Sequence, residues 1–364
     1  MSAMHINSNR MLFVLNLPII GLYIQIGREY FKWVVIVREI GNWKREASKP
    51  IGKLKANNYI KILPSSQRVT VLVVGGGVSG LSTVETLLSN GTDDVLLLEA
   101  TCRLGGRVQT IRRDGVLVEA GAEWIHGGPR NPVYKIADSL VALGENVPDE
   151  QYEWLLVTEN GEVRDEHNLI SYVGQNSSDD SSDDEEMSNW DLMQELWGET
   201  EANGVLAPYY DTAGYGQYFV DRFPEVFGDF ANSTEGKALL HALEQIVNGE
   251  EGTNDWLDIS ARDADAYVSY GEDHQWKDGY ETLITHILDK IPSSKIQLAS
   301  PVSEVYWDQN SLDGVLVVTS NGRSFLAQHV VFTTSVAYLK KHHQNIFSPP
   351  LPNAYIKALE VNCI

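Results

Sequence analysis

The chain has 364 residues, of which 43% are hydrophobic, and its formal net charge is −22. This length and composition suffice for two domains with their own cores, and they exclude a wholly disordered chain. Two cysteines, Cys102 and Cys363, cannot form a disulfide framework and suit a reducing, cytoplasmic compartment. The spacing of cysteine and histidine predicts no metal site.

The charge is unevenly distributed along the chain. Residues 145–280 contain 33 acidic and 5 basic side chains, whereas residues 1–67 carry a net charge of +7. A negative field of this kind disfavours nucleic-acid partners and concentrates cations near the surface. Two interpretations of this negative charge stay open. It could serve solubility, with one solvated acidic loop, or it could attract a cationic ligand.

Residues 1–67 form a leader of uncertain role. Met11 to Gln25 is apolar, but Asn16 and Pro18 interrupt it and it is shorter than the ~20 residues of a spanning helix. A weak N-terminal anchor and a leader that is not native both remain open. Apart from such an anchor, we expect no membrane partner.

A β-α-β unit follows at residue 68. The apolar run 68–74 predicts a buried parallel strand, and the apolar spacing over 78–89 predicts a helix that ends at Asn90-Gly91. A second buried strand is predicted at 95–98, directly before Glu99. The unit assigns residues 68–145 to the first part of a nucleotide-binding domain.

The middle of the chain differs from this unit. Residues 146–275 are rich in Tyr, Trp and acidic residues, with a helical pattern at 237–247, and predict a second, inserted domain. Within it, residues 176–188 include SSDDSSDDEE and predict a disordered acidic loop, with a phosphorylated patch as the alternative. From residue 276 the chain is expected to return to the first domain. A helix is predicted at 281–290, and strands are predicted at 296–298, 302–307, 314–319 and 329–333.

The stretch VLVVGGGVSG places the pattern G-x-G-x-x-G on Gly75, Gly77 and Gly80. After a strand and before a helix, these glycines allow a tight turn, close approach of a pyrophosphate and helix–strand packing. Glu99 stands where an acidic side chain accepts hydrogen bonds from ribose hydroxyls. The loop RLGGR, which ends in Arg107, offers a second phosphate contact, a trait more typical of flavin than of nicotinamide binding.

The segments EATCRLGGRVQT and VEAGAEWIHG resemble the flavin-containing amine oxidase family. The WIHG form resembles its polyamine oxidase branch, which includes spermine and acetylpolyamine oxidases. The resemblance continues in WKDGYETLITHI, KIQLASPVSEVYWD and VVFTTSVAYLKK, and it covers residues 68–364. It implies an α/β fold in which an inserted α+β substrate domain interrupts a Rossmann-like domain that binds FAD.

The resemblance also implies site residues. His126 would be the catalytic candidate, at the substrate tunnel beside the flavin, although it could merely be hydrogen-bonded under the ring. Glu123 could be a tunnel charge or a core-edge carboxylate. Lys340 and Lys341 are expected to be solvated residues after a strand, and Cys102 is expected to be inert. The implied FAD contacts are Gly75, Gly77, Gly80, Glu99, Arg107, Gly121, Ala122, Glu123, Trp124 and Val302.

The implied reaction oxidises a C–N bond of spermine, spermidine or an acetylated form with O2, and hydrolysis of the imine by water then gives an aldehyde and an amine beside H2O2. The chain ends soon after the family segment at 351–360, before the family's lysine near the flavin and its last FAD-contacting stretch. We therefore expect the C-terminal part of the FAD domain, within 276–364, to be incomplete. The alternative function is a truncated, non-catalytic flavoprotein-like paralogue or fragment. No peroxisomal signal ends the sequence, and a peroxisomal location is expected only for a full-length form.

Overall fold

The computed structural model describes residues 10–15, 24–26, 29–31, 33–36, 66–144, 155–157, 163–165, 189–201, 204–210, 214–266, 271–307 and 314–361. The chain divides into two compact units. The first unit comprises Met1–Ile26, Tyr30–Glu145 and Tyr270–Asn362, and the second comprises Gly27–Glu29, Asn146–Ser269 and Cys363–Ile364. The first unit contains the nucleotide-binding motif.

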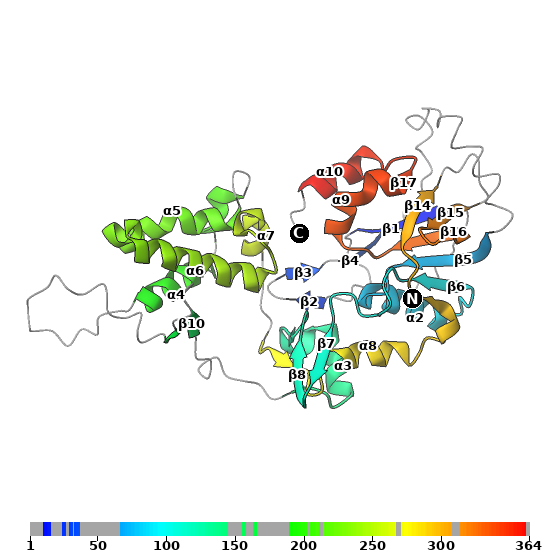
Figure 1. Ribbon diagram of the computed structural model, residues 1–364, viewed down its shortest axis with the longest axis horizontal. Helices are drawn as coiled ribbons and strands as arrows, with labels where there is room; N and C mark the ends of the chain where they lie inside the picture. The colour runs from blue at the N-terminus through cyan, green and yellow to red at the C-terminus, as the bar shows by residue number, and fades with distance from the viewer. Residues whose placement is uncertain are drawn as a thin grey trace, which may run out of the picture. The chain divides into compact units, whose positions relative to one another are not determined.

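A nine-stranded sheet forms the centre of the first unit (Figure 1). Its main path is β13 (Ile296–Gln297), β6 (Val95–Leu98), β5 (Gln67–Val74), β16 (Ser324–Phe332), β15 (Val315–Thr319), β14 (Val302–Tyr306) and β17 (Phe347–Ser348). β5 is parallel to both β6 and β16, whereas β15 is antiparallel to β14 and β16. β1 (Arg10–Leu15) pairs in parallel with the second half of β16 and antiparallel with β4 (Trp33–Ile36).

The period of two along β5 explains why helices cover both faces of the sheet. Val71 and Val73 point into one core, which α2 (Val78–Ser89) and α8 (Glu281–Leu288) complete. Leu72 and Val74 point into the opposite core, which α9 (Val336–Ile346) and α10 (Asn353–Val361) complete. The two helix layers lie on opposite sides of the sheet in Figure 1. The result is the predicted α/β fold.

Smaller elements extend the first unit beyond the sheet. β7 (Thr110–Arg113) and β8 (Val116–Glu119) form a hairpin, and β9 (Trp124–Ile125) pairs with β12 (His274–Gln275). α3 (Pro132–Ser139) begins at Asn131, whose side chain accepts a hydrogen bond from the Val133 N–H. β2 (Ile24–Ile26) and β3 (Glu29–Phe31) form a two-stranded sheet.

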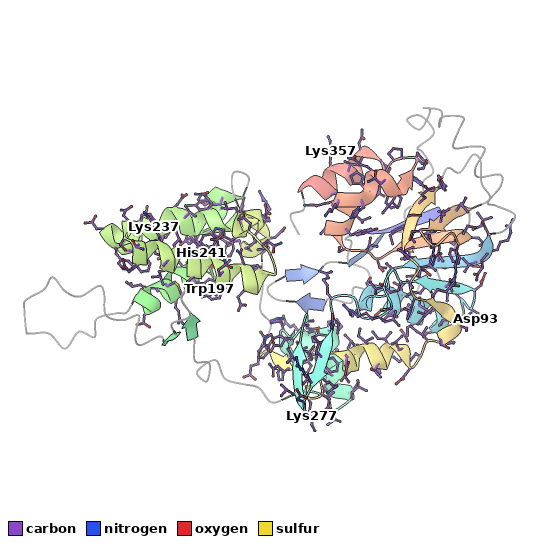
Figure 2. The ribbon with its side chains drawn as sticks, viewed as in Figure 1. Asp93, Trp197, Lys237, His241, Lys277 and Lys357 are labelled. Carbon is purple, nitrogen blue, oxygen red and sulfur yellow. The ribbon has the colours of Figure 1, made fainter. Side chains whose placement is uncertain are left out.

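The second unit is mostly helical around an aromatic core. Its elements are β10 (Leu155–Val157), β11 (Val163–Asp165), α4 (Asn189–Gly198), α5 (Tyr215–Phe227), α6 (Thr234–Glu251) and α7 (Ala261–Asp265). Aromatic residues on one face of α5 are buried, and Phe219 stacks on Trp256 with ring centroids 5.3 Å apart. Lys237 and His241 project from α6 one turn apart (Figure 2). Arg222 donates two hydrogen bonds of 2.9 Å to Glu199, which lowers the pKa of that carboxyl.

The first predicted strand, helix and second strand agree with β5, α2 and β6. β16 begins earlier than predicted, at Ser324, because residues 324–327 form a hairpin with β15 across the turn at Asn321-Gly322. The predicted disordered acidic loop at 176–188 lies outside the described residues. Within the described part of the chain, no helix is long and apolar enough to cross a membrane, and no group of three or more candidate metal ligands occurs.

Candidate functional site

The predicted phosphate loop lies at the carboxyl ends of β5 and β16. Val74 pairs with Phe332 at these ends, so that the residues after both strands meet. The chain leaves β5 toward β6 on one side, while β16 lies on the other side. This is a topological switch point, where open α/β sheets bind their ligands.

Gly75 and Gly80 are glycines because the protein itself leaves no room for a side chain. Gly75 has a φ of +115°, and a Cβ there would lie 2.5 Å from the Thr333 hydroxyl. A Cβ on Gly80 would lie 1.8 Å from the Gly75 carbonyl oxygen. These two residues therefore let α2 pack directly against the turn that precedes it.

Gly77 differs from Gly75 and Gly80 in this respect. Its φ is −77°, which any residue adopts, and an added Cβ would have its nearest described atom, the Gly106 Cα, at 3.8 Å. Nothing in the described chain therefore requires glycine at this position. Gly77 is also the N-cap of α2, which has no side-chain cap and no acidic residue in its first turn. An anion that approaches the helix N-terminus closely explains both features, so the loop fits a pyrophosphate.

Glu99 joins the phosphate loop to the loop that follows β6. One carboxylate oxygen accepts the Gly76 N–H at 2.6 Å, and the other accepts the Thr101 N–H and hydroxyl, each at 2.8 Å. The backbone of Glu99 also accepts the Ser300 N–H at 2.8 Å. Ser300 lies two residues before Val302, which begins β14 and is half-buried. Glu99 thus lies beside the glycines, and its backbone holds the segment that precedes Val302.

The second glycine loop lies against the first. Gly105 donates its N–H to the Gly76 carbonyl at 2.9 Å, and Gly106, with a φ of +59°, would place a Cβ 3.1 Å from the Gly77 Cα. Arg103 is exposed, and its side chain donates to the Gly106 and Val108 carbonyls of its own loop. Arg107 lies exposed on the loop. Both arginines are therefore exposed, and the hydrogen bonds of Arg103 shape the loop.

The segment 120–122 returns to this second loop. Ala122 is fully buried and donates its N–H to the Arg107 carbonyl at 3.2 Å. A Cβ on Gly121 would lie 1.9 Å from that same carbonyl oxygen. Gly121 and Ala122 are therefore explained by backbone packing, and they connect the phosphate loops to β9.

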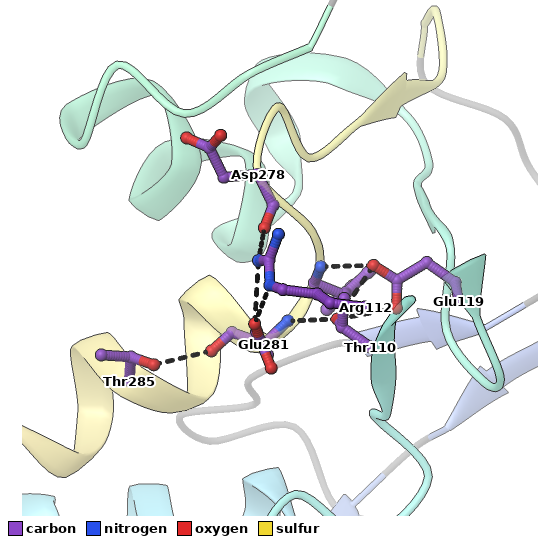
Figure 3. A network of polar contacts seen from close by, with 7 residues as sticks. Thr110, Arg112, Glu119, Asp278, Glu281 and Thr285 are labelled. Atoms are coloured by element: carbon purple, nitrogen blue, oxygen red, sulfur yellow. Dashed lines mark hydrogen bonds and ion pairs between the residues drawn. The ribbon is translucent and has the colours of Figure 1, made fainter. Parts of the chain in front are cut away.

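A polar network fixes the β7–β8 hairpin next to this segment (Figure 3). Glu119 accepts the Tyr280 N–H at 2.7 Å and the Thr110 hydroxyl at 2.9 Å, and Thr110 in turn accepts the Glu281 N–H. Arg112 pairs with Glu281 at the exposed side of the network. Burial raises the pKa of the Tyr280 hydroxyl. The network anchors the chain just before Gly121 to the start of α8.

Trp124 and His126 belong to a second group of residues, around the β9–β12 pair. Trp124 pairs with Gln275, which donates a 2.8 Å hydrogen bond to the exposed carboxylate of Glu123. His126 is 13% exposed at its side chain, and its Nδ1 lies 2.5 Å from Asp273 Oδ2. Residues 120–122 connect this group to the phosphate loops. Among the described residues, the hydrogen bonds of the Glu123 and His126 side chains go to Gln275 and Asp273 and not to those loops.

Sequence reasoning missed three polar residues at the site. Thr333 donates its hydroxyl to the Val74 carbonyl at 3.0 Å, and the Thr334 hydroxyl is buried without a hydrogen-bond partner in the described chain. Their signal was a Thr-Thr pair directly after a buried strand, at the end where ligands bind. Asp273 carried no local signal, because it lies 147 residues from His126.

The comparisons with known proteins find relatives in sequence and in fold. The peroxisomal N(1)-acetyl-spermine/spermidine oxidases of Bos taurus and Homo sapiens are 30% and 29% identical to 79% of this chain. The chain spans 58% of the length of each. A structure of putrescine oxidase bound to putrescine has a TM-score of 0.53 and 19% identity, and the alignment covers 81% of this chain and 64% of that one.

These relatives confirm the predicted polyamine oxidase branch and, with it, the predicted flavin cofactor, while the solved structure supports the fold alone. The family model described as flavin containing amine oxidoreductase matches residues 78–361, which is most of the chain. The chain therefore belongs to the family of flavin-containing amine oxidoreductases.

Proposed function

We propose that this chain binds FAD and oxidises a C–N bond of a polyamine with O2 and water: O2 accepts the two electrons and becomes H2O2, and water hydrolyses the resulting imine to an aldehyde and an amine. The observation that carries the proposal is Gly77. The protein's own packing does not require glycine there, and Gly77 is the N-cap of a helix that has no side-chain cap. A pyrophosphate at this N-terminus accounts for both. The family supports a flavin dinucleotide as its source.

Each predicted cofactor residue takes a role that its position supports. Gly75, Gly77 and Gly80 shape the pyrophosphate turn. The carboxylate of Glu99 has lone pairs that are not used by its hydrogen bonds to the loops, and these accept hydrogen bonds from ribose hydroxyls. Arg107 offers charge-assisted hydrogen bonds at the surface of the second loop. The buried Thr334 hydroxyl, without a described partner, joins these residues as a donor toward the cofactor.

Gly121, Ala122 and Trp124 carry the chain from the phosphate loops toward His126, and Val302 follows the segment that Ser300 holds against the Glu99 backbone. Bound FAD supplies the electron acceptor for C–N oxidation. His126 contacts the amine, and Glu123 places a carboxylate three residues before it. Polyamines carry several ammonium groups, so the acidic composition of residues 145–280 raises their local concentration.

We place the activity in the cytoplasm, on the composition argument that two cysteines suit a reducing compartment. The specific observation behind the alternative, a non-catalytic flavoprotein-like fragment, is that the chain spans 58% of the length of the matched acetylpolyamine oxidases. The two candidates differ in turnover and not in cofactor binding.

Peroxide formation by the FAD-loaded chain tests the proposal. We expect H2O2 with spermine, spermidine or N-acetylated spermine and none with benzylamine. His126→Gln should lower kcat/KM about tenfold or more, equivalent to ~1.4 kcal/mol. Lys341→Gln, at an exposed position of α9, serves as the matched control and should keep wild-type rates. Absence of peroxide with every polyamine would favour the non-catalytic alternative.

A further inference from the structure

The β9–β12 pair brings together two residues that lie far apart in the sequence. Ile125 pairs with His274, so that the residue after one strand faces the residue before the other. These residues are His126 and Asp273, whose Nδ1 and Oδ2 atoms are 2.5 Å apart. The second carboxylate oxygen of Asp273 accepts the Gly127 N–H at 3.0 Å. Asp273 therefore holds both the imidazole and the backbone that follows it.

The other side of His126 is also fixed. Its carbonyl accepts a 2.7 Å hydrogen bond from the side chain of Asn131, which caps α3. Its Nε2 is buried and has no hydrogen-bond partner among the described residues. Buried polar atoms in native proteins are nearly always hydrogen-bonded, so this nitrogen is placed for a ligand atom. The ring is thus held at Nδ1 and available at Nε2.

We propose that Asp273 is a positioning residue that holds His126 in the tautomer protonated at Nδ1, so that its buried Nε2 accepts a hydrogen bond from an amine N–H of the substrate. A carboxylate has only acceptors, and Asp273 uses one oxygen for the Nδ1–H and the other for the Gly127 N–H. A neutral imidazole protonated at Nδ1 has its lone pair at Nε2. The inference rests on the proposed function only in naming an amine as the donor.

Asp273→Asn separates this role from a structural one. The asparagine keeps the shape of the side chain but has one oxygen and one NH2 group. If its oxygen accepts the Gly127 N–H, its NH2 faces Nδ1, which must then be the acceptor and leave the proton on Nε2. The opposite orientation sets the NH2 against the Gly127 N–H. The variant therefore inverts the tautomer of His126 while the packing is preserved.

Nitrogen-15 NMR of the full chain with labelled histidine tests the tautomer directly, since protonated and unprotonated imidazole nitrogens have distinct shifts. The spectra are recorded about one unit above the ordinary imidazole pKa of about 6.5. His126→Gln identifies the signals of His126 by their loss. We expect a protonated Nδ1 and an unprotonated Nε2 in the wild type, and the reverse in Asp273→Asn. Asp278→Asn, an exposed aspartate of the same segment, is the matched control and should match the wild type.

Spermine, added anaerobically to the FAD-loaded chain, is the second probe. The account predicts a shift of the His126 Nε2 signal in the wild type, and a Kd for spermine that rises about tenfold or more in Asp273→Asn and partly recovers in Asp273→Glu. A wild-type His126 protonated at Nε2, or at both nitrogens, would overturn the inference, whether or not Asp273→Asn folds. The tautomer is read without turnover, so a chain that lacks oxidase activity would refute the proposed function and leave this measurement intact.

Discussion

Gly77 and Gly80 lie three residues apart in the same turn, and the structure gives them different reasons to be glycine. A Cβ on Gly80 would overlap the Gly75 carbonyl, whereas a Cβ on Gly77 would meet only an ordinary contact distance. The fold therefore requires glycine at position 80, and the proposed function gives position 77 its reason, the close approach of a ligand. The sequence pattern G-x-G-x-x-G does not distinguish between these two reasons for glycine.

The alanine variants of these two residues should therefore separate folding from cofactor binding. For Gly77→Ala we expect the free energy of unfolding without FAD to stay within about 1 kcal/mol of wild type, because its φ suits alanine. Its FAD affinity should fall about tenfold or more. Gly80→Ala should be destabilised by about 1–3 kcal/mol or more through overpacking. Urea unfolding and quenching of FAD fluorescence measure the two quantities, and equal destabilisation of both variants would contradict the account.

Residue by residue, the sequence predicts those site positions whose reason is local. Gly75, Gly80 and Glu99 stand at fixed offsets from a strand and a helix, which any reader of the pattern can locate. Asp273 could not be found in this way, because its partner is reached only through the pairing of two short strands. Thr334 lies between these two cases. Threonine by itself indicates no site, and only the position of Thr334 just after β16 points to one.

The β7–β8 hairpin shows how one element is held in place by a second one distant in sequence. Glu119, at the end of β8, accepts hydrogen bonds from the Tyr280 N–H and the Thr110 hydroxyl (Figure 3). The ion pair of Arg112 and Glu281 lies at the exposed edge, with side chains 54% and 44% exposed. The partly buried acceptor and the exposed ion pair should contribute differently to stability.

Glu119→Ala should lower the free energy of unfolding by about 1–3 kcal/mol, because two partly buried donors lose their acceptor. Arg112→Ala, in the same network, should change it by no more than about 1 kcal/mol, because solvent screens an exposed pair. The urea midpoints of the two variants give the comparison. A larger loss in Arg112→Ala than in Glu119→Ala would show that the exposed pair, and not the carboxylate, anchors the hairpin.

At the scale of elements, periodicity predicted what is long and regular. β5, α2 and β6 each satisfy a clear pattern, and their bounds differ from the prediction by at most one residue. β9 and β12 have two residues each, too few for any period, and their pairing depends on the tertiary structure. The early start of β16 was missed because residues 324–327 lie in a hairpin whose partner, β15, was predicted separately.

The whole molecule combines a three-layer α/β unit with a mostly helical second unit. The return of strand patterns after residue 276 predicted that the chain re-enters the first domain there, and in the structure β14, β15 and β16 belong to the same sheet as β5. Composition alone predicted the helical, aromatic character of the middle of the chain only in part. Its core depends on stacked pairs such as Phe219 and Trp256, which no periodicity announces.

The central claim is that this chain holds a flavin that receives electrons from a polyamine. The visible absorption spectrum of the purified, FAD-reconstituted chain, recorded before and after anaerobic addition of spermine, tests it most directly. An equal ionic strength of sodium chloride serves as the control addition. The account predicts flavin bands that remain with salt and bleach with spermine. A chain that retains no flavin bands, or one whose bands persist unchanged with spermine, would contradict it.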